Sequence, residues 1–284
     1  MKFLDVKTDY AFKKVFGSES SKEILISFLN AIIEFPKGGK IESLEIVDPY
    51  NIPMLKGMKD SFVDVKAVLD NKANVIIEMQ VLNVECFEKR ILYNAVKKYS
   101  NQLVKGEDYS LLNPVIALTI VNFEMFPELK RVISNFKLLE KEKFISYSDD
   151  VELVFVELPK FNKSLDGLED IKDEWIYFIK NAEDLTVVPE NIDPKIKEAL
   201  SVANEAGMTT DELELQHKRK DFIWQQESSV KKARTEGKIE GKIEGKIEGK
   251  IEIAINLLDF LDDKAIVDTT GLTLEKVKQL RNVN

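Results

Sequence analysis

Cysteine, histidine and long apolar segments are scarce in this sequence of 284 residues. Cys86 is the only cysteine, so no disulfide can form within the chain; we expect it to be a small buried residue in a cytoplasmic protein. His217 is the only histidine and lies in a polar segment, so we expect neither a histidine-based zinc site nor a histidine-dependent triad. No apolar run approaches the roughly 20 residues that cross a bilayer. Residues 1–5 lack the apolar stretch of a secretory signal, and we expect no membrane contact.

Positive charge is also in short supply, because the chain carries a formal net charge of −9. Residues 216–252 hold ten Lys and Arg against seven Asp and Glu, whereas residues 1–215 carry a net charge of −11. General attraction to phosphate groups therefore cannot be the main source of affinity for a nucleic acid. Three alternatives stay open: local basic patches bind DNA, divalent cations offset the carboxylates of a site, or DNA is not the substrate.

The chain does contain 44% hydrophobic residues, enough for a substantial core, and they recur at helix and strand periods. Helical spacing occupies 1–35, 85–105, 173–181 and 194–206. Strand-like patterns occupy 41–47, 61–69, 75–81, 115–123 and 151–158, with connections at Pro36, Pro49 and Pro53. This order predicts an α/β fold with a mixed sheet flanked by helices, over residues 1–210.

The composition changes near residue 210, and residues 211–252 are expected to form a polar helical linker. Gly-Lys-Ile-Glu occurs there four times in succession, over residues 237–252. An exact four-residue repeat aligns like charges at i,i+4, and each Gly costs about 1 kcal/mol relative to Ala in a helix. If the tract is helical, we expect its Ile stripe to contact a partner, most simply a second copy of the chain. A spacer without a partner is the alternative.

Residues 253–284 are expected to form a small helical module as a C-terminal extension. Residues 270–273, Thr-Gly-Leu-Thr, make a turn between two apolar helical patterns, with Thr273 as the N-cap of the second. This pattern is typical of a helix-turn-helix, which binds DNA in many proteins, and also of plain helical caps. Both interpretations stay open.

The candidate chemistry lies on a predicted hairpin. Because side chains alternate between the faces of a strand, Asp64 and Lys66 share one face, and Glu78 and Gln80 share a face of the next strand. A five-residue turn over 70–74 would place Lys66 opposite Glu78 and Asp64 opposite Gln80. All four polar groups would then converge on the face away from the core.

Two neighbouring carboxylates suit Mg²⁺, which prefers oxygen ligands. A cation held by Asp64 and Glu78 could polarise a phosphodiester and activate a water molecule. Lys66 could stabilise the developing negative charge, and Gln80 could orient water. The alternative is that these residues are only the polar, solvated face of a half-buried hairpin.

Five segments carry a resemblance to a known family. Asp64, followed by Glu78-Met79-Gln80 on the next strand, is similar to the signature of the PD-(D/E)XK nuclease superfamily, whose pattern is an Asp and then Glu-x-Lys. More closely, the chain resembles the Rpn family of recombination-promoting nucleases, also described as transposases. The segments that match are 7–17, 64–67, 77–80, 90–93 and 157–161, and the repeats near the C-terminus also fit.

This resemblance implies a restriction-endonuclease-like core and a metal-dependent DNA endonuclease with little sequence specificity, which promotes recombination or transposition. It implies that Asp64 and Glu78 are ligands of Mg²⁺ or Mn²⁺ and that Gln80 takes the place of the superfamily lysine. The positive group is then unassigned, and Lys66 is the candidate on geometry.

Asp9 is a possible accessory carboxylate from the first helix, or alternatively the N-cap of that helix. Arg90 and Gln102 are candidates for the DNA-facing side of the following helix, or alternatively for a solvated helix face. A different function also stays open: a catalytically weak, DNA-associated protein that oligomerises through its C-terminal helical region. The neutral Gln80 and the acidic residues 1–215 favour this alternative.

Overall fold

The computed structural model describes residues 1–35, 39–48, 50–51 and 61–283, and the connections predicted at Pro36, Pro49 and Pro53 lie outside them. The chain divides into two compact units, residues 1–223 and 224–284. None of the helices within the described ranges is both long enough and apolar enough to cross a bilayer.

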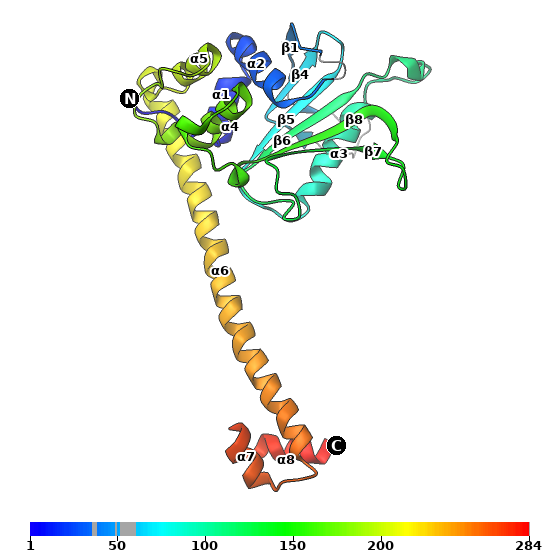
Figure 1. The fold of residues 1–284 in the computed structure, drawn as a ribbon, viewed down its shortest axis with the longest axis vertical. Helices are drawn as coiled ribbons and strands as arrows, with labels where there is room; N and C mark the ends of the chain where they lie inside the picture. The colour runs from blue at the N-terminus through cyan, green and yellow to red at the C-terminus, as the bar shows by residue number, and fades with distance from the viewer. Residues whose placement is uncertain (36–38, 49, 52–60, 284) are drawn as a thin grey trace. The chain divides into compact units, whose positions relative to one another are not determined.

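The first unit is built on a mixed six-stranded sheet (Figure 1). In spatial order its strands are β1 Leu44–Ile46, β4 Val65–Leu69, β5 Asn74–Gln80, β6 Val115–Val121, β8 Ser146–Glu157 and β7 Ile133–Leu139. β5, β6 and β8 are parallel neighbours, and the other pairings are antiparallel. All residues of β6 are buried, as its continuous apolar run predicts for a central strand. The predicted α/β fold with a mixed sheet is confirmed.

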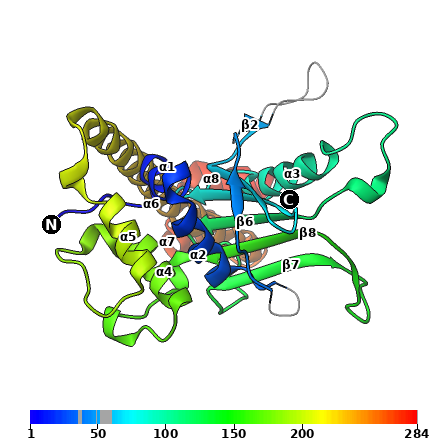
Figure 2. The ribbon, with the colours of Figure 1, turned by 90° about the horizontal axis from the view of Figure 1, so that it is seen from above.

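Two smaller features complete the strands. β2 Tyr50–Asn51 pairs with β3 Ser61–Phe62 as a separate antiparallel ribbon. Figure 2 shows β6, β8 and β7 side by side, and β7 is a strand that the sequence pattern did not predict. Its residues alternate imperfectly between half-buried and exposed positions, because β7 is the edge of the sheet and irregular in its pairing with β8.

Helices cover both faces of the sheet. On one side lie α1 Asp9–Phe16, α2 Lys22–Ile32, α4 Ile171–Asn181 and α5 Pro194–Val202, and on the other lies α3 Phe87–Ser100 (Figure 1). Phe16, Phe28 and Trp175 meet in the larger core, with ring centroids 4.8–5.8 Å apart. Short 3₁₀ turns occupy Glu19–Ser21, Tyr109–Leu111, Leu158–Lys160, Leu165–Gly167, Ala182–Asp184 and Glu205–Gly207.

A second core lies beneath α3, so the polar face of the hairpin is not the solvent face that the sequence suggested. Phe87 and Ile91 of α3 pack there with Ile76 of β5. Val63 also belongs to this core, whereas Val65, two residues later, belongs to the larger core on the other face. The reason is that β3 ends at Phe62 and β4 begins at Val65, which breaks the alternation between them.

Helix α3 is shorter than the sequence pattern suggested. It ends at Ser100, where the Asn101 N–H donates to the Lys97 carbonyl, and Gly106 lies in a later turn with φ 97°. Gln102 therefore lies beyond the helix. Its amide bonds both the N–H and the carbonyl of Asn113 at 2.9 and 2.8 Å, which fixes the approach to β6.

The second unit consists of the rest of α6 Thr210–Leu257 with α7 Asp263–Thr270 and α8 Leu274–Val283. Ala254, Leu258, Ile266 and Val277 form its core. Gly271 takes the left-handed conformation, φ 64°, that ends α7. The Thr273 hydroxyl accepts the N–H of Lys276 at 3.3 Å, which confirms the predicted N-cap. The repeats are helical throughout, as part of α6.

A largely buried ion pair fixes the end of β8. Glu157 has no exposed surface and accepts the N–H groups of Met125 and Phe126 at 2.7 and 3.1 Å. Lys160, one turn later, contacts Glu157 at 2.5 Å and donates to the Phe126 carbonyl at 2.8 Å. These contacts hold the segment after β6 against the end of β8.

Replacing Lys160 with Met should destabilise the fold, because Glu157 would keep its buried charge without a cation. We expect a loss of about 3 kcal/mol in the free energy of unfolding, measured by chemical denaturation. The matched control is Lys195→Met, which removes an exposed pair with Glu198 and should cost less than about 1 kcal/mol. Equal losses in the two variants would show that burial of Glu157 does not matter.

Candidate active site

Asp64 and Glu78 lie side by side at the start of the β4–β5 hairpin. The Asp64 N–H donates to the Ile77 carbonyl at 3.0 Å, and one Asp64 carboxylate oxygen accepts the Met79 N–H at 2.8 Å. Their side chains are only 14% and 13% exposed. Two carboxylates are therefore held close together in a largely buried position, which a merely solvated hairpin face would not require.

The register of this hairpin differs from the predicted one by two residues. Val65 pairs with Ile77 and Lys66 pairs with Ile76, and the ladder ends there, because Asp64 lies in a bend before β4 and its N–H donates to the Ile77 carbonyl. The predicted pairing of Lys66 with Glu78 is therefore wrong. The physical reason is a tighter turn: Lys72 adopts φ 67° and Asn74 is already part of the ladder. Because the shift is even, Lys66 keeps the face that alternation predicts, whereas Asp64 lies before β4 and is placed by its own hydrogen bonds.

Lys66 has different neighbours from those expected. The charge of Asp48 acts on Lys66, although burial lowers the pKa of the Lys66 amine overall. Burial, together with the charge of Lys66, also lowers the pKa of Lys98 to about 8. Lys66 therefore lies near a second lysine, Lys98 of α3.

Two other cations contact the carboxylates. Lys13 of α1 lies 3.2 Å from an Asp64 carboxylate oxygen. Arg90, in the first turn of α3, donates to the Glu78 carboxylate and, at 2.7 Å, to the Gln80 side-chain carbonyl. The Gln80 amide donates to the Leu82 carbonyl at 2.6 Å. Gln80, which stands where the superfamily pattern has a lysine, thus binds an arginine from α3.

Burial dominates the electrostatics of both carboxyls. It raises the pKa of Asp64, against the lowering effects of the Met79 N–H and the Lys13 charge. It also raises the pKa of Glu78, against the lowering effect of the Arg90 charge. The charge of Asp64 also raises the pKa of Glu78. The surrounding cations therefore compensate the two negative charges only in part.

The donor atoms present fit a divalent metal ion. Asn94 of α3 hydrogen-bonds Glu78, and its side-chain oxygen is a buried acceptor for which the described residues provide no partner. Two carboxylates and an amide oxygen are the hard ligands that Mg²⁺ takes, usually with several waters. Within the part of the chain that the structure describes, no group of three or more His, Cys, Asp or Glu side chains comes together, so this set is built on two carboxylates.

Asp9 lies near the pair but is held elsewhere. The Asp9 charge contributes to the raised pKa of Asp64, whereas the Asp9 carboxylate pairs with Arg219 at 2.9 Å. Asp9 is not the N-cap of α1. That position belongs to Thr8, whose hydroxyl accepts the Ala11 N–H.

The structure also places several candidates that the sequence left undecided or misjudged. Arg90 is part of the site and not simply a solvated residue. Cys86 is exposed, with φ 61°, immediately before α3, so the expectation that it is buried is wrong. Lys13 and Asn94 received no role from the sequence. Lys13 stands at i,i+4 from Asp9 and Asn94 at i,i+4 from Arg90, so helical spacing from those two candidates was the available signal.

The comparisons with known proteins gave one finding. Residues 6–233 match a family model described as PD-(D/E)XK nuclease family transposase. The match spans most of the chain and includes both carboxylates together with Lys13, Arg90 and Arg219. No curated protein and no solved structure matched.

Replacing Glu78 with Gln should change how the stability of the metal-free protein depends on pH. The folded-state pKa of Glu78 is raised above 4.5. Its contribution to the free energy of unfolding is therefore present at low pH and is lost as pH rises through that raised pKa. Glu78→Gln should therefore be more stable than the wild type at pH 8 and similar to it at pH 4, in thermal unfolding with a chelator present.

Asp70→Asn provides a control of opposite sign. The N–H groups of Glu42 and Ser43 lower the pKa of the Asp70 carboxyl below 3.8. The contribution of Asp70 to the free energy of unfolding is therefore present at neutral pH and lost in acid. This variant should be less stable than the wild type at pH 8. A Glu78→Gln protein that is also less stable at pH 8 would contradict the interpretation of the site.

Proposed function

The chain belongs to the PD-(D/E)XK nuclease family of transposases, and on that premise we propose that it is a divalent-metal-dependent DNA endonuclease. The proposed reaction is hydrolysis of phosphodiester bonds with little sequence specificity, in the course of recombination or transposition. The observation that supports it is the buried pair of Asp64 and Glu78, whose charges the neighbouring cations compensate only in part.

Asp64, Glu78 and the Asn94 side-chain oxygen would hold Mg²⁺ or Mn²⁺. A divalent cation supplies Lewis-acid polarisation of a phosphodiester and a lowered pKa for a bound water. The residues of the chain fix where this chemistry takes place. The Met79 N–H, next to Glu78 on β5, orients the Asp64 carboxylate at 2.8 Å.

Arg90 is the proposed positive group for the phosphate. Its side chain is 43% exposed, so one side of the guanidinium can face a substrate while the other bonds Glu78 and Gln80. A planar guanidinium suits the oxygens of a phosphodiester better than a flexible ammonium does. Gln80 would then act by orienting Arg90, which accounts for a neutral side chain at this position.

Lys66 keeps a proposed role at a distance from the reacting group. It lies on β4, two residues after Asp64 in the chain, and near Lys98. Two neighbouring ammonium groups would neutralise a phosphate beside the one that reacts. Local cations of this kind would allow DNA to bind in spite of the net charge of −9.

Nicking of supercoiled plasmid with Mg²⁺ or Mn²⁺ tests the proposal. Asp64→Asn and Glu78→Gln should each lower the rate by about 10²-fold or more, because each removes a charged ligand. Asp149→Asn, an exposed carboxylate on β8, is the matched control and should cut like the wild type. If Asp64→Asn also cuts like the wild type, the site is misassigned. Salt-dependent DNA binding by the wild type without cleavage in any divalent metal would favour a DNA-associated interaction protein.

The same assay separates the roles of the cations. Arg90→Met should lower kcat, because its contact forms to the reacting group, whereas Lys66→Ala should chiefly raise KM. If Lys66→Ala lowers kcat as much as Arg90→Met does, the assignment of Lys66 to a neighbouring phosphate is wrong. Folding of each variant is checked by its thermal unfolding.

We also propose that the repeat tract, residues 237–252, binds a second copy of the chain. Ile239, Ile243 and Ile247 are 56%, 53% and 47% exposed along α6. In this tract a Lys and a Glu always differ by two, six or more positions in the sequence, never by three or four. Lys and Glu within one helix are therefore not neighbours on its surface and do not pair. In keeping with that spacing, none of the ion pairs among the described residues involves the tract.

A parallel arrangement of two such helices would supply the missing partners. Lys precedes and Glu follows each Ile, so the two charges flank the Ile stripe on opposite sides. In a parallel pair, the Lys flank of one helix faces the Glu flank of the other, whereas an antiparallel pair would align like charges. The charge pattern therefore favours a parallel pair.

Replacing the four Lys of the tract with Glu should abolish self-association, which light scattering or sedimentation can measure as a lower mass. Replacing the four Glu with Lys should do the same, and mixing the two variants should restore a paired species. An unchanged mass after deletion of residues 237–252 would rule out this interface.

A further inference from the structure

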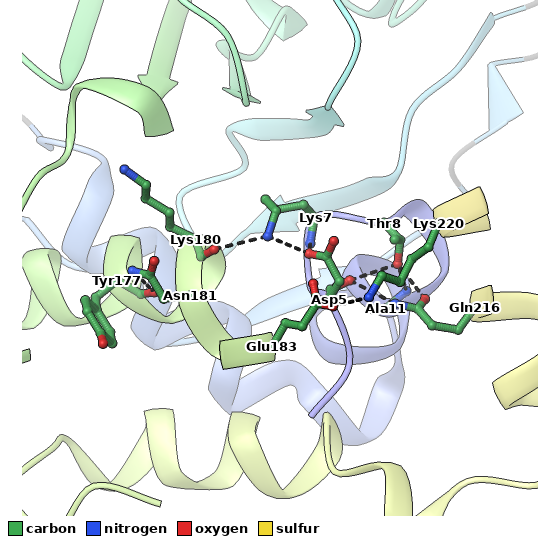
Figure 3. A network of polar contacts seen from close by, with 10 residues as sticks. All are labelled: Asp5, Lys7, Thr8, Ala11, Tyr177, Lys180, Asn181, Glu183, Gln216 and Lys220. Atoms are coloured by element: carbon green, nitrogen blue, oxygen red, sulfur yellow. Dashed lines mark hydrogen bonds and ion pairs between the residues drawn. The ribbon is translucent and has the colours of Figure 1, made fainter. Parts of the chain in front are cut away.

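The first turns of α6 bind the N-terminal helix through one face. Gln216 is 3% exposed and accepts a hydrogen bond from the buried Thr8 hydroxyl at 2.6 Å, and its amide donates to the Asp5 carbonyl at 3.2 Å (Figure 3). One turn earlier, Glu212 accepts from Tyr10 at 2.7 Å and pairs with Lys14. Thr8 is also the N-cap of α1, so α6 contacts the residue at which α1 begins.

The chain before α1 is fixed in the same network. Lys7 pairs with Asp5 at 2.7 Å and donates to the Lys180 carbonyl at 3.1 Å (Figure 3). Lys220 of α6 pairs with Glu183, just after α4. The start of α1 is therefore held from two sides, by α6 and by the end of α4.

Arg219 continues this face of α6, three residues after Gln216. It pairs with the Asp9 carboxylate at 2.9 Å, with both side chains partly exposed. Asp9 and Lys13 are at i,i+4 on α1, in the order in which an acidic and a basic side chain attract each other on a helix. Lys13 nevertheless contacts Asp64 at 3.2 Å. Lys13 thus has two carboxylates within its range, and Arg219 engages one of them.

We infer that Arg219 is a positioning residue: by binding Asp9, it directs Lys13 to Asp64. Without Arg219, the Asp9 carboxylate would lose its cation and compete for Lys13 along α1. Asp64 would then lose the cation that offsets its buried charge. Any effect of Arg219 on catalysis rests on the proposed function. Whether Lys13 pairs with Asp64 or with Asp9 does not depend on that function.

A set of double-mutant cycles on the full chain, with a chelator present, tests this inference. Unfolding of the first unit is followed by the fluorescence of Trp175, which is fully buried there, in a Trp224→Phe background that removes the exposed tryptophan. In that background, Lys13→Met should raise the unfolding equilibrium constant by a factor of about two to five. The factor should fall towards one when Asp64→Asn is also present, because the partner is already gone.

In Arg219→Met, this coupling of Lys13 to Asp64 should disappear, and coupling of Lys13 to Asp9 should appear in its place. Adding Asp9→Asn to Arg219→Met should restore the coupling to Asp64, since the competing carboxylate is removed. Arg219→Lys, which keeps a cation next to Asp9, should behave like the wild type. A residue that only stabilised α6 would not produce this exchange or its rescue.

The inference is overturned if coupling between Lys13 and Asp64 is the same with Arg and with Met at position 219. It is equally overturned if coupling is lost in Arg219→Met and Asp9→Asn does not restore it. Neither result involves cleavage of DNA. A chain that fails to nick plasmid but shows the exchange would contradict the proposed function alone.

Discussion

The energetic constraint at the centre of this protein is the burial of two carboxylates on adjacent strands. Asp64 and Glu78 are less than one-sixth exposed, and burial raises the pKa of both. Negative charges in such a position must be offset by nearby positive charge or donors. Lys13, Arg90 and the Met79 N–H provide part of this compensation, and the uncompensated remainder is the basis for the proposed metal ion.

Each compensating group comes from a different element, so the site depends on the whole first unit. The Met79 N–H of β5 holds the Asp64 carboxylate beside Glu78, α3 brings Arg90 and Asn94, and α1 brings Lys13. α3 can reach the hairpin because it packs over a second core on that face of the sheet. A sheet with only one covered face would leave these carboxylates in water, with little effect on their pKa.

Helix α6 carries contacts to α1 in its first turns and the charged repeats in its later turns. Its first turns contact α1 through Gln216 and Arg219, close to the candidate site. Its later turns carry charges that cannot pair within the helix because of their four-residue period. The same helix therefore takes part in the arrangement of the site and presents a surface whose charge pattern is complementary to a second copy of itself.

The sequence alone determined the α/β class and the central strand β6, because period and alternation are local properties of the chain. It did not determine the hairpin register, since one left-handed residue at Lys72 shortened the turn. Nor did it show that α3 covers the polar face, or that Lys13 and Arg90 are the neighbouring cations. Those contacts join residues separated by 10 to 51 positions, and only tertiary packing brings such residues together.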